Sequence, residues 1–277
     1  MQPQGINDTL LNRLLFRAIY RLMTNKLIRR WVNHRGRVVF AFPRLCIKST
    51  GFTTLAEAQA MRFVSQNTTI PVPHVHCAFK LKGRVYIVME RIEGRDLSIG
   101  WVQRSEESKA RILNQLKFIM EELRSIPPPE DVGIANVSGG PIYDQRLPKK
   151  SAWGPFSSIR EFHTELRNGI PASDVNGDET VAPGLNKLIA FHEQEWPRPV
   201  FTHGDLSSLN VLAQGDKITG IIDWETAGWM PPYWEYTSAW HVNPQNMFWQ
   251  QEVDKFLTPL PYELEMEIIR RKYFGDF

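Results

Sequence analysis

Three polar residues in the last third of the chain have the types and spacing that phosphoryl transfer needs. Asp205 and Asn210 lie five residues apart, and Asp223 follows Asn210 by thirteen. Gly215-Asp216 separates two β-type runs, which predicts a tight hairpin that brings Asn210 and Asp223 together. Their oxygens are hard ligands of the kind that Mg²⁺ takes, and Asp205 is then available to orient a substrate hydroxyl.

A simpler interpretation of the same residues stays open. Loop Asp and Asn side chains commonly hydrogen-bond their own backbone, and Asp205 and Asn210 would then be turn residues with no catalytic role.

The stretch from His203 to Asp223 resembles the catalytic loop and metal-binding strand of the aminoglycoside phosphotransferase and choline kinase family, distant relatives of the protein kinases. The resemblance implies that Asp205 is the catalytic base and that Asn210 and Asp223 hold Mg²⁺. It is similar above all to fungal aminoglycoside phosphotransferase-like proteins, over about residues 38 to 240.

The resemblance also implies an α+β, protein-kinase-like fold with two lobes. We expect a small β-rich nucleotide-binding lobe over residues 1–95, with an extra N-terminal helix, and a larger helical catalytic and substrate lobe over 96–277. No internal repeat and no linker between independent domains is visible in the sequence.

The first lobe contains a predicted hairpin, Val38 to Phe42 and Leu45 to Ser49, whose second strand carries Lys48. In the family a strand Lys reaches the ATP phosphates and is oriented by a helix Glu, which the resemblance assigns to Glu57 in a predicted helix from Leu55 to Ser65. Thr54 and Glu57 also fit a capping box, in which Glu57 would bond the helix start instead.

An apolar strand from Val85 to Met89 leads into a short polar stretch that ends at Gly94. By resemblance this is the hinge that bonds the adenine edge, through the carbonyl of Glu90 and the amide of Ile92, with Met89 behind them. The alternative is an ordinary strand followed by a glycine turn.

The chain departs from the family where a glycine-rich loop should cover the phosphates, because only Gly5 and Gly36 precede Lys48. Two interpretations are open. A short basic loop from Asn33 to Arg37 replaces it, with Arg35 or Arg37 reaching the phosphates, or the first strand of the lobe is absent and the lobe is truncated.

The N-terminal segment predicts a basic amphipathic helix that begins near Thr9. Apolar residues from Leu11 to Leu27 recur at helical spacing, and arginines and a lysine lie between them. Such a helix packs against its own domain or lies on a membrane surface.

The second lobe is predicted to contain helices from Glu106 to Arg124, Phe156 to Asn168 and Leu185 to Glu195. Beyond Asp223 the chain is rich in aromatic rings, which either surround a cationic substrate group or form the core. We name Glu225, Trp229 and Glu235 as candidate substrate contacts, although either acid could pair with a neighbouring arginine.

Composition sets the wider limits. The 277 residues are 42% hydrophobic and 23% charged, enough for a sizeable core. The net charge of +3 and the lack of a basic stripe with interleaved aromatics argue against nucleic acid. Two cysteines, no transmembrane span and no signal peptide favour a reducing, cytoplasmic setting.

Together these features predict a small-molecule kinase that transfers the γ-phosphoryl group of ATP to a substrate hydroxyl with Mg²⁺. The alternative is a kinase-like binding or regulatory protein without phosphotransfer activity, which the missing glycine loop motivates.

Overall fold

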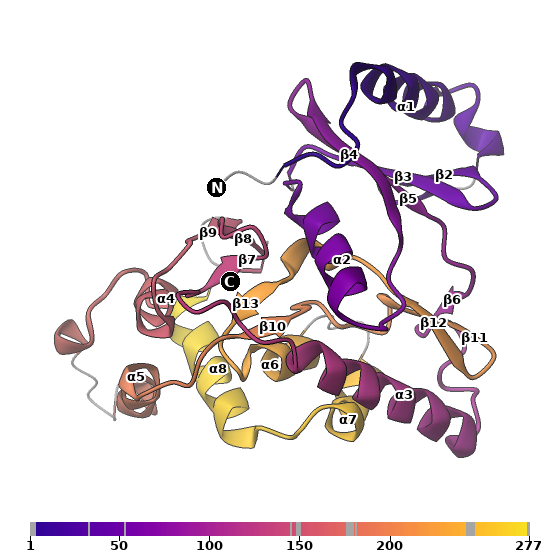
Figure 1. The fold of residues 1–277 in the computed structure, drawn as a ribbon. Helices are drawn as coiled ribbons and strands as arrows, with labels where there is room; N and C mark the ends of the chain where they lie inside the picture. Colours follow the sequence, from indigo (N-terminus) through magenta and orange to yellow (C-terminus); the bar gives the residue numbers. More distant parts are fainter. Residues whose placement is uncertain are drawn as a thin grey trace. The chain divides into compact units, whose positions relative to one another are not determined.

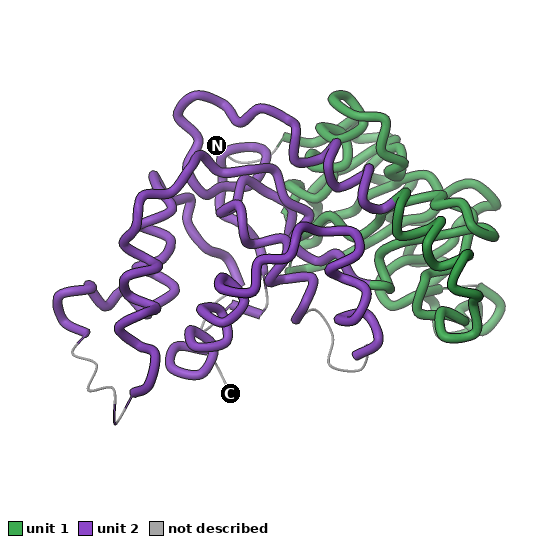
Figure 2. Tube along the Cα trace, turned by 90° about the horizontal axis from the view of Figure 1, so that it is seen from below, with its two compact units in different colours: residues 1–115, 208–225 green, residues 116–207, 226–277 purple. Residues whose placement is uncertain are grey.

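The computed structural model describes residues 4–32, 34–52, 54–144, 146–147, 151–175, 180, 182–241 and 247–275. The chain forms two compact units, shown in green and purple in Figure 2. Unit 1 contains residues 1–115 and 208–225, and unit 2 contains residues 116–207 and 226–277. This division differs from the expected boundary near residue 95, because residues 96–115 and the hairpin after the catalytic motif pack with the N-terminal part.

A five-stranded antiparallel sheet forms the larger part of unit 1, in the order β1-β2-β3-β5-β4 (Figure 1). β3 pairs with β2 on one side and β5 on the other, so Lys48 lies opposite both Val38 and Ile87. A first strand is therefore present, although it has only two residues. The strands are β1 (His34–Arg35), β2 (Val38–Phe42), β3 (Leu45–Thr50), β4 (Val75–Leu81) and β5 (Arg84–Glu90).

Two helices cover opposite faces of this sheet (Figure 1). Successive side chains of a strand point to opposite faces of the sheet, so the neighbours Ile47 and Lys48 lie on different faces. Ile47 belongs to the apolar cluster against which α1 (Leu10–Met23) packs. Lys48 contacts Glu57 of α2 (Ala56–Asn67) on the other face. The expected helices near Thr9 and Leu55 are thus confirmed, and Thr9 caps α1 by accepting a hydrogen bond from the amide of Asn12.

A second sheet in unit 1 has the order β12-β11-β6 and contains the expected hairpin. The strands are β6 (Arg95–Asp96), β11 (Val211–Gln214) and β12 (Lys217–Ile221). Asp216, in the turn between β11 and β12, accepts hydrogen bonds from Arg104, Ser108 and Arg111. These residues belong to the start of α3 (Glu106–Arg124) or directly precede it, so the helix fixes the tip of the hairpin.

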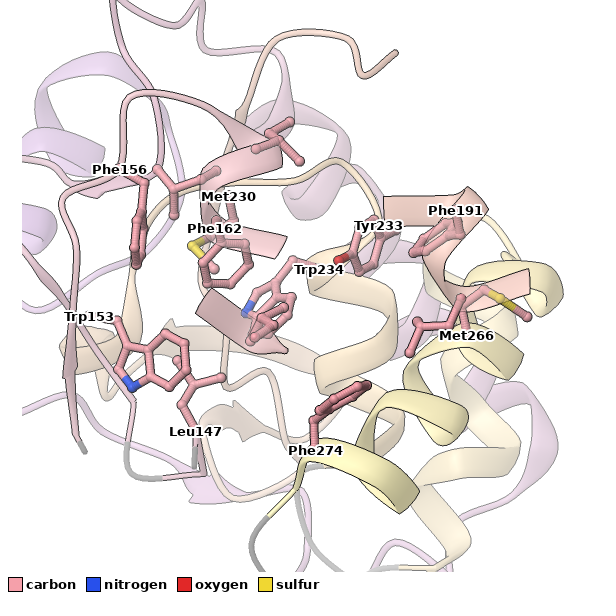
Figure 3. Close-up of a cluster of buried hydrophobic side chains, with 14 of the residues drawn as sticks. Leu147, Trp153, Phe156, Phe162, Phe191, Met230, Tyr233, Trp234, Met266 and Phe274 are labelled. Atoms are coloured by element: carbon pink, nitrogen blue, oxygen red, sulfur yellow. The ribbon is translucent and has the colours of Figure 1, made fainter. Parts of the chain in front are cut away.

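Unit 2 is mainly helical around an aromatic core (Figure 3). Phe162, Tyr233 and Trp234 are buried in this core, and the rings of Phe162 and Trp234 meet edge to face with centroids 5.2 Å apart. The helices of unit 2 beyond α3 are α4 (Ile159–Leu166), α5 (Leu185–Glu193), α6 (Trp234–His241), α7 (Met247–Phe256) and α8 (Pro261–Phe274).

Short strands complete unit 2 in two small sheets, β10-β13-β7 and β8-β9. Their bounds are β7 (Ala135–Asn136), β8 (Ile142–Tyr143), β9 (Ala152–Trp153), β10 (Val200–Thr202) and β13 (Gly228–Met230). Three 3₁₀ turns are η1 (Arg29–Trp31), η2 (Ala172–Asp174) and η3 (Trp224–Thr226). Within the described ranges, no helix is both long and apolar enough to cross a membrane.

Candidate functional site

Asp223 follows strand β12 in a backbone conformation that is unusual for a residue with a side chain. Its φ is 66°, in the left-handed region that ordinary residues avoid. The amide of Ile222, the preceding residue, donates to the carbonyl of Asn210, which ties the two ends of the hairpin together. Such strained positions occur preferentially at functional sites, and here the turn carries the Asp223 carboxylate to Lys48.

The ammonium group of Lys48 is the centre of the charged cluster in unit 1. Its Nζ lies 2.9 Å from Glu57 Oε1, 2.6 Å from Asp223 Oδ1 and 3.1 Å from Glu225 Oε2. The structure therefore brings the expected Lys48 and Glu57 together as an ion pair, while the Thr54 hydroxyl accepts from the amide of Ala56 rather than that of Glu57. Glu225, expected beside a substrate, contacts Lys48 instead.

The charges of this cluster control each other. Burial alone lowers the pKa of Lys48, but the carboxylates of Glu57, Asp223 and Glu225 outweigh burial and raise it overall, so Lys48 is a cation at neutral pH. Burial raises the pKa of Glu57 to about 7 in spite of the neighbouring ammonium group. Glu57 therefore depends on Lys48 to remain ionised.

The cluster also has the composition of a divalent cation site. Carboxylate oxygens of Glu57, Asp223 and Glu225 all lie within 4.8 Å of one another. Three carboxylates against one ammonium leave a formal excess of two negative charges, which matches one Mg²⁺, and oxygen donors suit that ion. Oε2 of Glu57 is buried without a hydrogen bond, so the cluster retains an unused acceptor. This donor set has the chemistry that Mg²⁺ prefers, and of the two expected ligands it contains Asp223.

A cavity of about 440 Å³ lies in unit 1, between the five-stranded sheet and the β11–β12 hairpin. Burial raises the pKa of the Cys46 thiol in its wall to about 12, so this cysteine is a neutral, apolar lining group. The cavity is lined by Arg35, Val38, Phe40, Pro43, Cys46, Pro73, Met89, Glu90, Arg91, Ile92, Glu93, Gly94, Leu212 and Ile222.

All three expected hinge residues, Met89, Glu90 and Ile92, line this cavity. Within the described part of the chain, the backbone N–H of Ile92 makes no hydrogen bond, whereas the neighbouring Arg91 amide donates to the carbonyl of Arg44. A free backbone donor in a mostly apolar cavity can bond a polar ring edge. Sulfur of Cys46 approaches the carbonyl of Glu90 at 3.6 Å.

The turn between β1 and β2 contains the short basic segment that we expected in place of a glycine-rich loop. Gly36 provides the left-handed conformation there, with φ at 57°. Arg35 lines the cavity and forms a 3.0 Å ion pair with Asp96. Arg37 instead stacks over the ring of Phe52, 4.8 Å from its centroid. Of the two arginines expected near the phosphates, the structure brings only Arg35 to the cavity.

In unit 2, the loop that carries Asp205 is held by buried polar contacts. Gly204 has φ at 78°, in the left-handed region that favours glycine. A Cβ there would also lie 3.1 Å from the carbonyl oxygen of Thr226, so both the backbone conformation and the space favour glycine. The carboxylate of Glu235 accepts hydrogen bonds from the amides of His203 at 2.6 Å and Gly204 at 3.1 Å. The His-Gly-Asp spacing is thus explained by a buried, braced turn.

Arg146 completes the surroundings of Asp205 and was not identified from the sequence. Its guanidinium contacts Asp205 Oδ1 at 3.1 Å and pairs with Asp144 through two nitrogens at 2.8 Å each. It also donates to the carbonyl of Gly204. Nothing in the local pattern around residue 146 indicates this role, because the partner lies 59 residues away.

The other two substrate candidates have structural surroundings. Glu235 is fully buried, and its carboxylate is used by the backbone of the catalytic loop. Trp229 is buried in β13, with its ring 5.1 Å from that of Phe201. Most rings beyond Asp223 are likewise buried, as the core interpretation expects: Trp224, Trp229, Tyr233, Trp234, Tyr236 and Trp249. We therefore do not propose Trp229 or Glu235 as substrate contacts.

Solved structures share this fold. A thermostable mutant of aminoglycoside phosphotransferase APH(4)-Ia in its apo form is 18% identical, with a TM-score of 0.61, covering 88% of this chain and 87% of that one. A ternary complex of a thermostable mutant of that enzyme with ADP and hygromycin B is also 18% identical, with a TM-score of 0.62. The match covers 90% of this chain and 88% of that one. The gentamicin–APH(2")-IIa complex is 13% identical, with a TM-score of 0.52. The match covers 97% of this chain and 86% of that one. The protein-kinase-like fold expected from the sequence is confirmed.

One curated relative has a detectable sequence similarity. Clavilactone A biosynthesis cluster protein Y of Ampulloclitocybe clavipes is 25% identical over 195 residues, which cover 61% of this chain and 48% of the relative. The chain thus spans about half the length of that protein. The model of the phosphotransferase enzyme family matches residues 24–260, and on that extent of agreement the chain belongs to the phosphotransferase enzyme family.

Proposed function

We propose that the protein is an ATP-dependent kinase that phosphorylates a hydroxyl group of a small molecule in the cytosol. The observation that carries the proposal is the arrangement in unit 1, where the Lys48 cluster and a mostly apolar cavity occur in the same compact unit. Family membership and the nucleotide complexes of structural neighbours support it.

The cavity would hold the adenine of ATP. Val38, Leu212 and Ile222 offer apolar surface to the faces of a flat ring, and the free N–H of Ile92 offers one donor to its edge. The carbonyl of Glu90 would accept from the exocyclic amine, as expected from the hinge position. The side chain of Met89, which lines the same cavity, would contribute further apolar surface to the adenine site.

Lys48 would bind the phosphates, and Glu57 would keep it extended and charged. Three carboxylates hold Lys48 in the structure. Phosphate oxygens would replace some of these contacts. Asn210 and Asp223 would hold Mg²⁺, which when bound supplies charge neutralisation for the phosphates. Glu225 is a further oxygen donor for the same ion.

Asp205 would accept the proton of the substrate hydroxyl as its oxygen attacks the γ-phosphorus. The bond between that phosphorus and the bridging oxygen of ADP breaks, and ADP leaves. Arg146 holds the Asp205 carboxylate at 3.1 Å, and Glu235 fixes the backbone that carries it. Such positioning contributes through orientation, since little covalent chemistry is left for the protein to perform.

A binding protein without phosphotransfer activity is the second candidate. It is motivated by the turn between β1 and β2, which contains the single glycine Gly36, so few backbone amides can approach the phosphates. The two functions differ in whether bound nucleotide passes a phosphoryl group to an acceptor.

The first test is a thermal shift with ATP and Mg²⁺. At 100 times its dissociation constant the nucleotide adds about 2.7 kcal/mol to stability, which corresponds to about 5 to 10 °C for a chain of this size. Asp223→Asn should lose the Mg²⁺-dependent part of the shift, whereas Asp131→Asn, an exposed control, should keep it. No shift with any nucleotide would refute the kinase.

The second test is ADP release in the presence of a panel of aminoglycosides, aminoalcohols and sugars. Asp205→Asn should lower turnover about 10²- to 10⁴-fold without weakening ATP binding. Nucleotide binding without acceptor-dependent ADP release from any panel member would favour the binding protein.

A further inference from the structure

Helix α1 has two separate apolar faces, and only one of them is used by the fold. Phe16, Ile19, Tyr20 and Met23 pack against the cluster on the five-stranded sheet. A second stripe has helical spacing of four, three and four residues and consists of Leu11, Leu15, Ala18 and Leu22. Leu11 is 74% exposed and Leu22 59% exposed, so this second stripe is solvent-facing in a helix that is already docked.

The exposed apolar surface continues beyond the helix. Leu27 is 75% exposed in the turn that follows, and Trp31 in η1 is 80% exposed. The guanidinium of Arg30 stacks over the Trp31 ring, 5.4 Å from its centroid. We call the surface formed by Leu10, Leu11, Leu14, Leu15, Leu22, Leu27 and Trp31 the N-terminal face.

The charges around the N-terminal face all have one sign. No acidic residue occurs between Asp8 and Glu57, whereas basic residues recur throughout that stretch. Among the described residues, no carboxylate pairs with Arg21, Lys26, Arg29 or Arg30. Arg13 of the same helix, in contrast, is neutralised by Asp8. Uncompensated cations beside exposed leucines and a tryptophan are typical of segments that lie on anionic membranes.

We infer that the N-terminal face docks on an anionic lipid bilayer surface. A second copy of the chain is a poorer partner, because a symmetric interface places the same patch on both subunits and would bring these cations together. An anionic leaflet instead accepts the leucines at its acyl boundary and the cations among its headgroups. Helix α1 presents this face while its other side is packed on the five-stranded sheet, so docking requires no release of the helix.

A basic cavity at the end of α1 suits a lipid phosphate. It encloses about 330 Å³, and its charged lining groups are Arg29, Arg37 and Arg84, with His34 beside them and no acid among the described lining residues. Tyr20 and Thr24 of the helix end also line it. A headgroup phosphate could enter this cavity while the leucines of the N-terminal face contact the acyl chains.

The experiment is co-flotation of the full chain with vesicles. We expect binding to phosphatidylcholine vesicles containing about 30% phosphatidylserine, weak binding to pure phosphatidylcholine, and release as salt shortens the screening length. Leu11→Gln/Leu22→Gln should lower partitioning by about tenfold or more. Arg21→Gln/Lys26→Gln should lower it by about 25-fold, from about fivefold for each cation.

Matched variants separate the N-terminal face from general stickiness and charge. Phe118→Gln/Ile268→Gln removes two comparably exposed apolar side chains, 61% and 51% exposed, from α3 and α8. Arg62→Gln/Lys217→Gln removes two exposed cations elsewhere in unit 1. Both controls should bind as the unaltered chain does. Equal losses in variants and controls would overturn the inference.

Three other outcomes would also overturn it. One is the absence of binding to the anionic vesicles by a folded chain. Another is a concentration-dependent dimer, measured by sedimentation, that Leu11→Gln/Leu22→Gln dissociates, because the face would then be an interface between copies. The third is binding of soluble phosphate in the basic cavity beside His34 by a chain that does not bind the vesicles. This result would assign the cavity to a free anion and refute lipid docking.

Discussion

Replacing Lys48 by methionine is the sharpest perturbation of the charged cluster. The change keeps the length and apolar stem of the side chain but removes the only cation that contacts Glu57 among the described residues. At 2.9 Å and an effective dielectric constant of about 20, the attraction between these two charges is about 6 kcal/mol. Because Glu57 is left buried, the expected loss of unfolding free energy is about 3 to 5 kcal/mol near pH 8.

The sign of the pH dependence provides a second readout. Burial raises the pKa of Glu57 to about 7 even with Lys48 present, and loss of the cation raises it further. An acid whose pKa is raised by folding lowers stability as pH increases, up to its folded-state pKa. The variant therefore continues to lose stability above pH 7, where the unaltered protein no longer does, and the difference should be about 1 kcal/mol larger at pH 8 than at pH 6.

The assay is urea unfolding followed by circular dichroism, in the presence of a chelator. Lys80→Met, on the exposed side of β4, is the control and should change stability by less than about 0.5 kcal/mol. Lys48→Met/Glu57→Leu should recover much of the loss, since both charges are then absent. A loss below about 1 kcal/mol, or one independent of pH, would refute the assignment of Lys48 as the buried counter-ion.

Two predictions concern unit 2. Burial lowers the pKa of His163 to about 4, so stability should fall by about 3 kcal/mol as pH decreases from 6.5 towards 4. A melting temperature independent of pH in that window would contradict this. His163→Phe should reduce the slope, and His192, whose pKa burial also lowers, keeps the rest. Glu235→Gln, which weakens the brace on His203 and Gly204, should cost about 1 to 3 kcal/mol in urea unfolding, whereas Glu195→Gln on the surface should not.

Local patterns were sufficient for strands and helices that turn signals or caps delimit in the sequence. The β2–β3 hairpin and α3 have the bounds expected to within two residues, and the β11–β12 hairpin turns at the expected Gly215-Asp216. In contrast, α6 was not identified, because every position from Trp234 to Ala239 is buried. A helix buried all round has no apolar and polar alternation for a sequence to show.

The candidate site divides in the same way. Residues that the resemblance to the family named, such as Lys48, Glu57 and Asp223, meet in the structure, although their catalytic roles stay predictions. The roles of Arg146 and Glu235 could not be predicted from the sequence, since both depend on contacts between segments tens of residues apart. A sequence shows that a carboxylate is present but not which backbone amides it will meet.

Unit 1 is discontinuous, since β11 from residues 211–214 pairs with β6 from residues 95–96. This connectivity sets an order of events during synthesis. The ribosome makes the first 115 residues well before the closing hairpin, and at about 5 to 20 residues per second the interval is roughly 5 to 20 s. Throughout that time β6 lacks its neighbour, and Lys48 and Glu57 lack Asp223. The N-terminal part of unit 1 therefore cannot complete its fold until β11 and β12 have been synthesised.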